Sequence, residues 1–212
     1  MKNHEFRGLK MKVVVVASQK GGAGKTTLSA HVACAAPGSI LLDADPQGSL
    51  KEWWEAREAE EPPMLSGTVE TLPEAIEAAR GAGYRVMVID TPPGVGDALA
   101  QIIAAADFVL IPVRPSPHDF RAVDATAGLC RSAGKPFAFV VNAAKARTQL
   151  KAAARGALEP SGAVAPVEVI DRVVFAESMI EGKTAGEVEP DGAAAGEIKS
   201  LWEWLSSEMG RA

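Results

Sequence analysis

Cysteine, aromatic residues and long apolar runs are all scarce in this chain of 212 residues. The two cysteines, Cys34 and Cys130, have neither the spacing of a metal site nor the number that a disulfide framework needs. Because the sequence shows no signal peptide and no apolar run of membrane-spanning length, we expect a cytoplasmic protein. A net charge of −5 excludes a surface that is basic all over, so any contact with nucleic acid must come from a local patch.

The composition that remains, 47% hydrophobic and 23% charged, is typical of a folded domain with a substantial core. Short apolar runs alternate with helical stretches, and such runs suit strands of a parallel sheet that is buried on both faces. The expected strands are Lys12–Ala17, Ser39–Leu42, Arg85–Asp90, Phe108–Val113, Phe137–Val141 and Val167–Ile170. The expected helices are Leu28–Ala35, Gly48–Ala59, Leu72–Arg80, Asp97–Ala105, Phe120–Ala133 and Gln149–Leu158. We therefore expect one doubly wound α/β domain over residues 11–212, with a mainly parallel sheet flanked by helices, after a disordered leader over residues 1–10.

A glycine-rich turn joins the first expected strand to the first expected helix. The run Lys20-Gly21-Gly22-Ala23-Gly24-Lys25-Thr26-Thr27 has the form of a phosphate-binding loop. Its glycines let backbone N–H groups close around phosphate oxygens, and the following helix N-terminus adds its dipole. Lys25 supplies a positive charge for the outer phosphates, and the Thr26 hydroxyl is suited to ligate Mg²⁺. The run therefore predicts a site for a nucleoside triphosphate with its magnesium ion.

Carboxylates end two of the expected strands. Asp43 and Asp45 follow an apolar run, and the alternation of side chains puts both on the same side of the chain. Asp90 closes another apolar strand, where an aspartate can hold Mg²⁺ directly or through water. The prolines and glycines after Asp90 form a turn that can respond to a terminal phosphate. Taken alone, Asp43 and Asp45 would also suit a helix N-cap and a neighbouring turn.

The loop departs from the ordinary pattern G-x-x-x-x-G-K-S/T. Gln19 stands where the first glycine belongs, and a second lysine, Lys20, follows it. The pattern K-G-G-x-G-K-S/T resembles the deviant Walker A box of the ParA/MinD ATPases, which are P-loop NTPases. The resemblance continues in the family's order through Asp43-Ala44-Asp45-Pro46-Gln47-Gly48 and Asp90-Thr91-Pro92-Pro93-Gly94. It covers nearly the whole chain from about Met11 on.

The resemblance implies ATP and Mg²⁺ as cofactors and gives each residue a role. Lys20 would reach across an ATP-dependent sandwich dimer to the nucleotide of the other subunit, where a cation stabilises developing charge; the alternative is a solvated loop lysine. Asp45 would orient the attacking water, Asp43 would lie in the magnesium network, and Asp90 would hold the ion. Asn142, at the end of an expected strand, would read the adenine, although a turn asparagine is nearly as ordinary an interpretation.

The C-terminal stretch carries an apolar stripe at helical spacing, formed by Ile198, Leu201, Trp202, Leu205 and Met209. MinD-like members of the family bind membrane through a C-terminal amphipathic helix. Here the polar face is rich in glutamate, whereas a membrane-surface helix favours lysine and arginine. We therefore expect this helix to dock on the protein's own core and expect no membrane partner.

Between Asn142 and Leu158 the chain has four basic residues and no acidic one: Lys145, Arg147, Lys151 and Arg155. The last three recur at i, i+4 and i+8, which is a single stripe if this segment is a helix. Such a stripe is suited to track the phosphates of duplex DNA, which the ParA branch binds without sequence preference. A solvated helix face is an equally good interpretation of the same residues.

The sequence thus predicts a ParA-like ATPase that converts ATP to ADP and phosphate. Its ATP-bound homodimer would bind nucleoid DNA, and a ParB-like partner would trigger hydrolysis, so that a plasmid, a chromosome or another large cargo is partitioned or positioned. A MinD-like membrane-cycling ATPase and a P-loop metabolic ligase are the alternatives. Cys34 does not suit the cysteine pair of an iron protein, and a single tyrosine, Tyr84, does not suit a tyrosine kinase of this fold. The length leaves no room for an N-terminal helix-turn-helix domain, so operator-specific repression is not expected.

Overall fold

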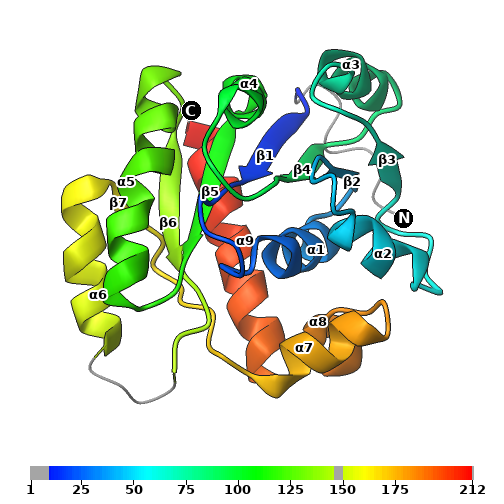
Figure 1. Ribbon diagram of the computed structural model, residues 1–212. Coiled ribbons are helices and arrows are strands. Elements are labelled where there is room, and N and C mark those ends of the chain that lie inside the picture. Colours follow the sequence, from blue (N-terminus) through cyan, green and yellow to red (C-terminus); the bar gives the residue numbers. More distant parts are fainter. Residues whose placement is uncertain (1–9, 146–149, 212) are drawn as a thin grey trace.

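The computed structural model of the protein describes residues 10–145 and 150–211. Its centre is a parallel sheet in which the strands run in the order β3-β2-β4-β1-β5-β6-β7 (Figure 1). The strands are β1 (Lys12–Val16), β2 (Ser39–Asp43), β3 (Met64–Ser66), β4 (Val86–Asp90), β5 (Phe108–Val113), β6 (Phe137–Val141) and β7 (Ala163–Val164). The chain winds outward from β1 in both directions, so the predicted doubly wound α/β fold is confirmed.

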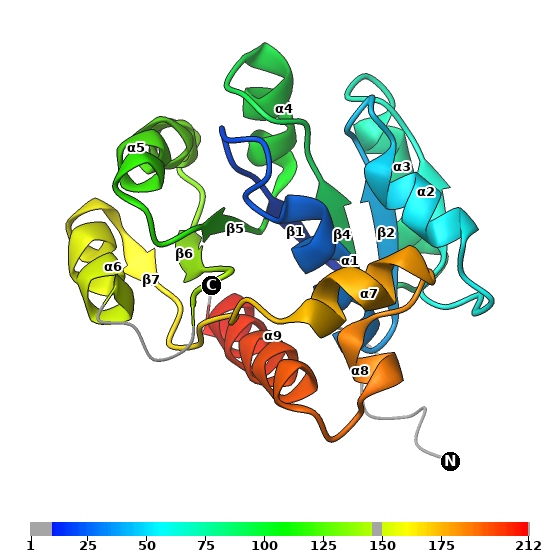
Figure 2. The same cartoon turned by 60° about the horizontal axis from the view of Figure 1, so that its bottom comes forward.

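Helices cover both faces of this sheet (Figure 2). One face is packed by α3 (Leu72–Gly81), α4 (Asp97–Ala105), α5 (Pro117–Ser132) and α6 (Leu150–Leu158), the last of which is followed by a short 3-10 turn, Glu159–Ser161. The other face is packed by α1 (Lys25–Ala35), α2 (Ser49–Glu55), α7 (Val173–Ile180), α8 (Ala185–Val188) and α9 (Ala193–Arg211). The layered arrangement leaves the carboxyl ends of the strands open for a ligand.

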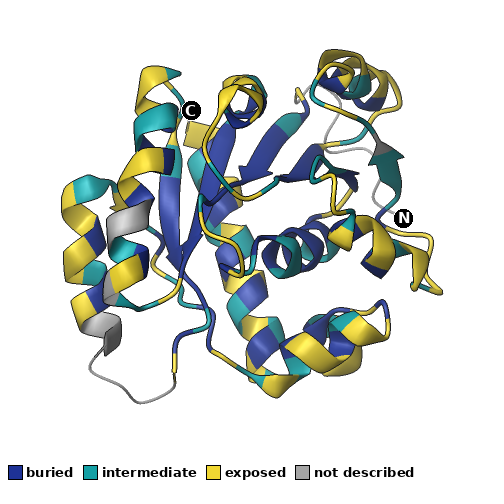
Figure 3. Cartoon of the chain, viewed as in Figure 1, coloured by how far each residue is buried: buried dark blue, intermediate teal, exposed yellow. Residues whose placement is uncertain are grey.

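The core lies on the two faces of the central strands, which are buried along their length (Figure 3). In β1, Val13 and Val15 contact the side of α3 to α6, while Val14 and Val16 contact the side of α1 and α9. All four valines are 0% exposed. This explains why the strand is a continuous β-branched run, since alternation toward water has no place in a sheet covered on both faces.

Helix α9 turns the predicted apolar stripe toward the core. Ile198, Leu201, Leu205 and Met209 are buried against the sheet and α1, and Trp202 is partly buried beside them. The expectation that this helix docks on its own core is confirmed. In the parts of the chain that the structure describes, no helix has both the length and the apolar character needed to cross a membrane.

The edge strands β3 and β7 and the helices α7 and α8 were not predicted. The edge strands β3 and β7 have three and two residues, too few for a pattern to show. The predicted strand Val167–Ile170 is wrong: only Ile170 forms an isolated bridge, with Ala144. The predicted helix Gly48–Ala59 is too long, because α2 ends at Glu55 and the chain then turns toward α8.

Candidate nucleotide-binding site

The loop between β1 and α1 has the open shape of a phosphate cradle. Gly22 and Gly24 have φ angles of 73° and 89°, a left-handed conformation that favours glycine. A Cβ built on Gly21 or Gly22 would meet nothing within 4 Å, so the front of the loop is unobstructed. Backbone N–H groups of such a loop, together with the N-terminus of α1, are suited to bind the oxygens of a polyphosphate.

The back of the same loop rests on Asn142, which follows β6. The Asn142 Nδ2 group donates a hydrogen bond of 2.8 Å to the carbonyl oxygen of Ala23, and the residue is buried. A Cβ on Gly24 would lie 2.3 Å from this nitrogen. Asn142 therefore supports the loop, a role that the sequence did not indicate. The residue also borders a cavity of about 170 Å³ with Thr27 and Phe175, so its contact with an adenine stays a prediction.

The predicted carboxylates meet at one edge of the sheet. Pairing of β2 with β4 puts Asp43 opposite Asp90, and pairing of β1 with β4 puts Val16 opposite Asp90. The Thr26 hydroxyl donates to Asp90 Oδ2 at 2.7 Å, and the Ser29 hydroxyl donates to Asp90 Oδ1 at 3.2 Å. Burial raises the pKa of Asp90 to about 7, against the opposing effect of the Thr26 hydrogen bond. A divalent cation beside Asp90 would favour its ionised form.

Lys25 is the first residue of α1 and is only 7% exposed. Burial lowers the pKa of its ammonium group, and the charges of Asp90 and Asp45 partly offset that effect. An anionic phosphate in the cradle would further stabilise the charged form of Lys25. The site therefore fits a nucleotide whose outer phosphates contact this side chain.

The donor set at the end of β4 fits magnesium. Thr26, Asp90 and Asp43 offer a hydroxyl and two carboxylates, which are the oxygen ligands that this ion prefers. Among the residues that the structure describes, no group of three or more His, Cys, Asp or Glu side chains could hold a metal ion. Phosphate oxygens and water would have to complete the coordination, as is usual for Mg²⁺ in nucleotide sites.

The loop after β2 is held by its own aspartates. Asp43 Oδ1 accepts a hydrogen bond from the N–H of Asp45, and Asp43 Oδ2 accepts one from the N–H of Lys51 in the first turn of α2, both at 3.0 Å. Asp45 Oδ1 accepts from the N–H of Gln47 at 2.9 Å. Asp43 thus also serves the helix end, the alternative that its sequence context allowed. Burial raises the pKa of Asp43, and these hydrogen bonds work in the opposite direction.

Lys20 forms an ion pair with Asp119 in the first turn of α5 of its own subunit. The Lys20 side chain is 46% exposed and that of Asp119 is 7% exposed. The Ser116 hydroxyl donates to Asp119 Oδ2 at 2.6 Å. Burial would raise the pKa of Asp119, but the hydrogen bonds from Lys20 and Ser116 outweigh it and hold the pKa below its usual value. Sequence reasoning missed Asp119, although the pattern Ser116-x-x-Asp119 is a sign of a helix start.

The turn after β4 touches the same loop. The N–H of Gly94 donates to the carbonyl oxygen of Gln19, and the Thr91 hydroxyl donates to the carbonyl oxygen of Val16, both at 2.9 Å. The predicted second switch therefore contacts the phosphate-binding loop, so a terminal phosphate bound in the cradle would lie close to it.

The structure describes only part of the predicted basic stripe. Lys145 is exposed after β6, Arg147 lies outside the described residues, and Lys151 is placed only by its position in α6. The Arg155 Nη2 group donates to the carbonyl oxygen of Ala165 at 2.7 Å and its Nη1 lies 3.9 Å from Glu159. The guanidinium of Arg155 is thus already engaged within its own subunit.

Taken together, the glycine cradle, the buried Lys25 and the aligned carboxylates at the end of a parallel sheet define a P-loop nucleotide-binding domain. A model of the CobQ/CobB/MinD/ParA nucleotide binding domain matches residues 14–185, and the chain belongs to this family.

Individual proteins are also similar to this chain in sequence or in fold. Maintenance of carboxysome distribution protein A of Halothiobacillus neapolitanus is 33% identical over 202 residues, which cover 89% of this chain and 93% of that protein. The chromosome-partitioning ATPase Soj of Thermus thermophilus is 30% identical over 154 residues, which cover 57% of this chain and 60% of that protein. The fold is shared with MinD of Pyrococcus furiosus, with a TM-score of 0.77 at 19% identity over 93% of this chain and 99% of that one. It is also shared with a Cyanothece McdA–ATP complex, with a TM-score of 0.73 at 18% identity over 96% of this chain and 98% of that one.

Proposed function

We propose that this protein is a ParA-like ATPase whose ATP-bound form is a sandwich dimer. The observation that carries the proposal is the different placement of two lysines in one loop. Lys25 is buried at the start of α1 beside Asp90, whereas Lys20 is half exposed and is held by Asp119 of α5. One lysine therefore serves the nucleotide of its own subunit, and the other is accessible to a second subunit that faces the loop.

In this proposal each residue of the site has a separate role in ATP hydrolysis. The backbone from Gly21 to Thr27 and the Lys25 ammonium group bind the phosphates, and Thr26, Asp43 and Asp90 would hold Mg²⁺, whose charge would neutralise part of theirs. Asp45 orients the attacking water. Lys20 exchanges Asp119 for the nucleotide of the partner subunit, where its charge stabilises the transition state. Hydrolysis then depends on dimerisation, because the complete set of cations exists only in the dimer.

The dimer would bind duplex DNA without sequence preference and associate with the nucleoid. Lys145, Arg147 and Lys151 are the proposed contacts, with a smaller part for Arg155 because of its bonds to Ala165 and Glu159. A chain with a net charge of −5 should bind poorly as a monomer, and two-fold symmetry doubles the contacts. DNA binding should therefore require ATP.

The cargo is proposed to be a large assembly or a replicon. A relative that aligns with 89% of this chain is named for carboxysome distribution, and another is named for chromosome partitioning. A ParB-like partner that binds the dimer and triggers hydrolysis completes the cycle. The membrane-cycling alternative is disfavoured because the apolar stripe of α9 already contacts the core.

The proposal is tested by sedimentation with two kinds of target. The parent protein should pellet with duplex DNA in the presence of Mg²⁺ and ATP, but not with ADP and not with liposomes. The Lys25→Ala variant is the control and should pellet with neither. If each subunit contacts about three phosphates, the slope of log K against log salt should be near −5. ATP-dependent pelleting with liposomes instead of DNA would support the membrane-cycling ATPase, and turnover that requires a small-molecule acceptor would support the ligase.

A further inference from the structure

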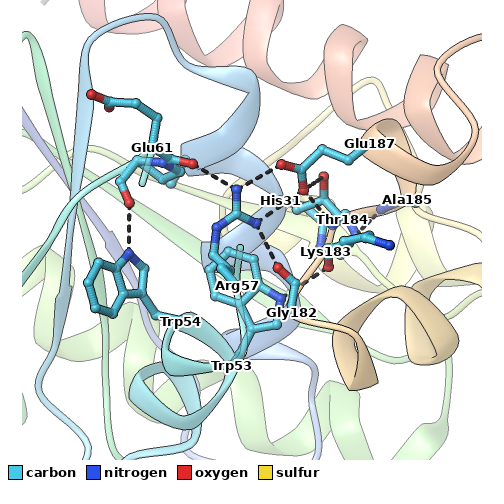
Figure 4. A network of polar contacts seen from close by, with 12 residues as sticks. His31, Trp53, Trp54, Arg57, Glu61, Gly182, Lys183, Thr184, Ala185 and Glu187 are labelled. Carbon is cyan, nitrogen blue, oxygen red and sulfur yellow. Dashed lines mark hydrogen bonds and ion pairs between the residues drawn. The ribbon is translucent and has the colours of Figure 1, made fainter. Parts of the chain in front are cut away.

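The end of α2 is attached to the turn between α7 and α8 (Figure 4). Arg57 makes a two-pronged ion pair with Glu187 of α8, with Nη2–Oε1 and Nη1–Oε2 distances of 2.7 and 3.1 Å. The same guanidinium donates to the carbonyl oxygens of Gly182 and Glu61, at 2.9 and 2.7 Å. The Arg57 side chain is 1% exposed. These four bonds fix the position of the chain where it leaves α2.

Three further contacts stabilise the place where the end of α2 meets the turn between α7 and α8, and we call this region the junction. The indole N–H of Trp53 donates to the carbonyl oxygen of Lys183 at 3.0 Å, and the Arg57 guanidinium lies 4.7 Å from the centre of the Trp53 ring. A Cβ on Gly182 would lie 2.4 Å from the carbonyl carbon of Ala56. The two backbones therefore touch, and a side chain at position 182 would force them apart.

Glu187 lies in α8, and the start of α8 is in turn hydrogen-bonded to α1, the helix that follows the phosphate-binding loop. Its carboxylate accepts hydrogen bonds from the N–H and the hydroxyl of Thr184, at 2.7 and 2.9 Å, and the bond from the N–H belongs to the capping box of α8. The next N–H, that of Ala185, donates to His31 Nε2 at 2.9 Å, and His31 Nδ1 lies 2.7 Å from the carbonyl oxygen of Thr27. Thr27 is part of the first turn of α1, directly after the cradle.

The other end of α2 begins at the aspartates of the site. Asp43 accepts the N–H of Lys51 in the first turn of α2, and it also accepts the N–H of Asp45. Hydrogen bonds thus run from Thr27 through His31 and α8 to Arg57, and then along α2 to Asp43 and Asp45. The Arg57–Glu187 pair is the ion pair at which this connection crosses between two segments 130 residues apart in sequence, beside the bonds of Arg57 to Gly182 and of Trp53 to Lys183.

We propose that the Arg57–Glu187 pair positions the loop of Asp43 and Asp45 relative to the P-loop, so that Arg57 is a positioning residue for ATP hydrolysis. This inference rests on the proposed ATPase function. Arg57 acts through α2: a short helix of seven residues moves as a unit, and its far end is fixed by the junction. Displacing the water-orienting carboxylate by about 1 Å is enough to slow a reaction by up to about 100-fold.

The electrostatics of the pair agree with a rigid connection. Burial would raise the pKa of Glu187, but its hydrogen bonds with Arg57 and Thr184 outweigh this and hold the pKa below the usual value. A paired and nearly buried guanidinium that donates to four oxygens has little freedom to rearrange. The neighbouring pair of Lys183 with Glu181, in the same turn, has side chains that are 48% and 62% exposed and contributes no such constraint.

The test compares variants on the two sides of the junction. Arg57→Gln and Glu187→Gln should lower kcat for ATP hydrolysis by about 10-fold to 100-fold, while the affinity for ATP stays within about threefold of the parent, because the cradle and Lys25 are untouched. The double variant should lose no more than Arg57→Gln alone, since that substitution already removes every bond between Arg57 and Glu187. Glu181→Gln is the matched control and should hydrolyse ATP like the parent. Glu187→Gln keeps the volume and an acceptor for Thr184, so it decides the matter if the Arg57 variant does not fold.

Equal loss of ATP affinity and kcat in Glu187→Gln would overturn the inference, since it would show a general structural role. Parental kcat in both junction variants would overturn it as well. An inactive parent protein that still binds ATP would instead contradict the proposed ATPase function.

Discussion

Replacing Gly24 by alanine should damage the phosphate cradle from behind. The residue has a φ of 89°, and a left-handed conformation costs a residue with a Cβ about 1–2 kcal/mol. The new Cβ would lie 2.3 Å from Asn142 Nδ2, so Asn142 must move and give up its bond to Ala23. Losing that buried hydrogen bond costs about 1–3 kcal/mol. We expect the free energy of unfolding to fall by roughly 2–5 kcal/mol, the sum of the two contributions.

This loss is large enough to measure by thermal unfolding. For a domain of this size, 1 kcal/mol corresponds to about 2–4 °C, so the Tm should fall by roughly 4–20 °C. ATP binding should be lost as well, because the displaced loop no longer directs its N–H groups at the phosphates. Calorimetry of unfolding and a titration with ATP measure the two effects separately.

Gly21→Ala is the matched control in the same loop. A Cβ there meets nothing within 4 Å, and its φ is not among the positive ones, so its Tm should stay within a few degrees of the parent's. Adding Asn142→Ala to Gly24→Ala should cost little more, since the alanine substitution has already displaced that side chain. If Gly24→Ala unfolds at the same temperature as Gly21→Ala and binds ATP equally well, the packing of Asn142 behind the loop is wrong.

Three further predictions concern the site and its supports. Asp45→Ala should slow single-turnover hydrolysis by about 100-fold or more and accumulate an ATP-bound dimer on DNA; normal turnover would exclude a water-orienting role. Burial lowers the pKa of His31 from 6.5 to about 4, so the unfolded chain takes up this proton first and stability should fall as the pH drops from 6.5 to 4, by about 3 kcal/mol. His31→Gln should flatten that dependence, and an equally steep profile in the variant would assign it to other groups. Burial raises the pKa of Cys34 to about 12 and that of Cys130 to about 11, so iodoacetamide at pH 8 should modify both only after unfolding in urea; rapid labelling of the native protein would show that the thiols are accessible.

The regular parts of the fold could be predicted because each has a local cause. Strands β5 and β6 were predicted to the residue, since their apolar runs end at turn-forming residues. The cradle could be predicted because its glycines and lysines stand in one continuous run of the sequence. The run Val167–Ile170 also looked like a strand, but its pairing beside β6 is limited to one isolated bridge, between Ile170 and Ala144.

The contacts that hold the nucleotide site in place could not be predicted because they join distant parts of the chain. Asn142 lies 119 residues from the loop carbonyl that it contacts, and Arg57 lies 130 residues from Glu187. No spacing rule links residues so far apart. The ion pair of Lys20 with Asp119 could not be predicted for the same reason. Asp119 was visible only as a residue near a helix start, and its ion pair with Lys20 follows from how α5 packs beside the loop.

The central claim is that Lys20 serves the nucleotide of a second subunit. The most direct test is the mass of the particle in solution, measured by size-exclusion chromatography with light scattering, with Mg²⁺ and a slowly hydrolysed ATP analogue. The parent protein should shift from monomer to dimer when the analogue is added. Lys20→Ala should still bind the analogue through Lys25 but remain a monomer. An undiminished dimer in that variant, or a parent protein that stays monomeric at saturating analogue, would contradict the account.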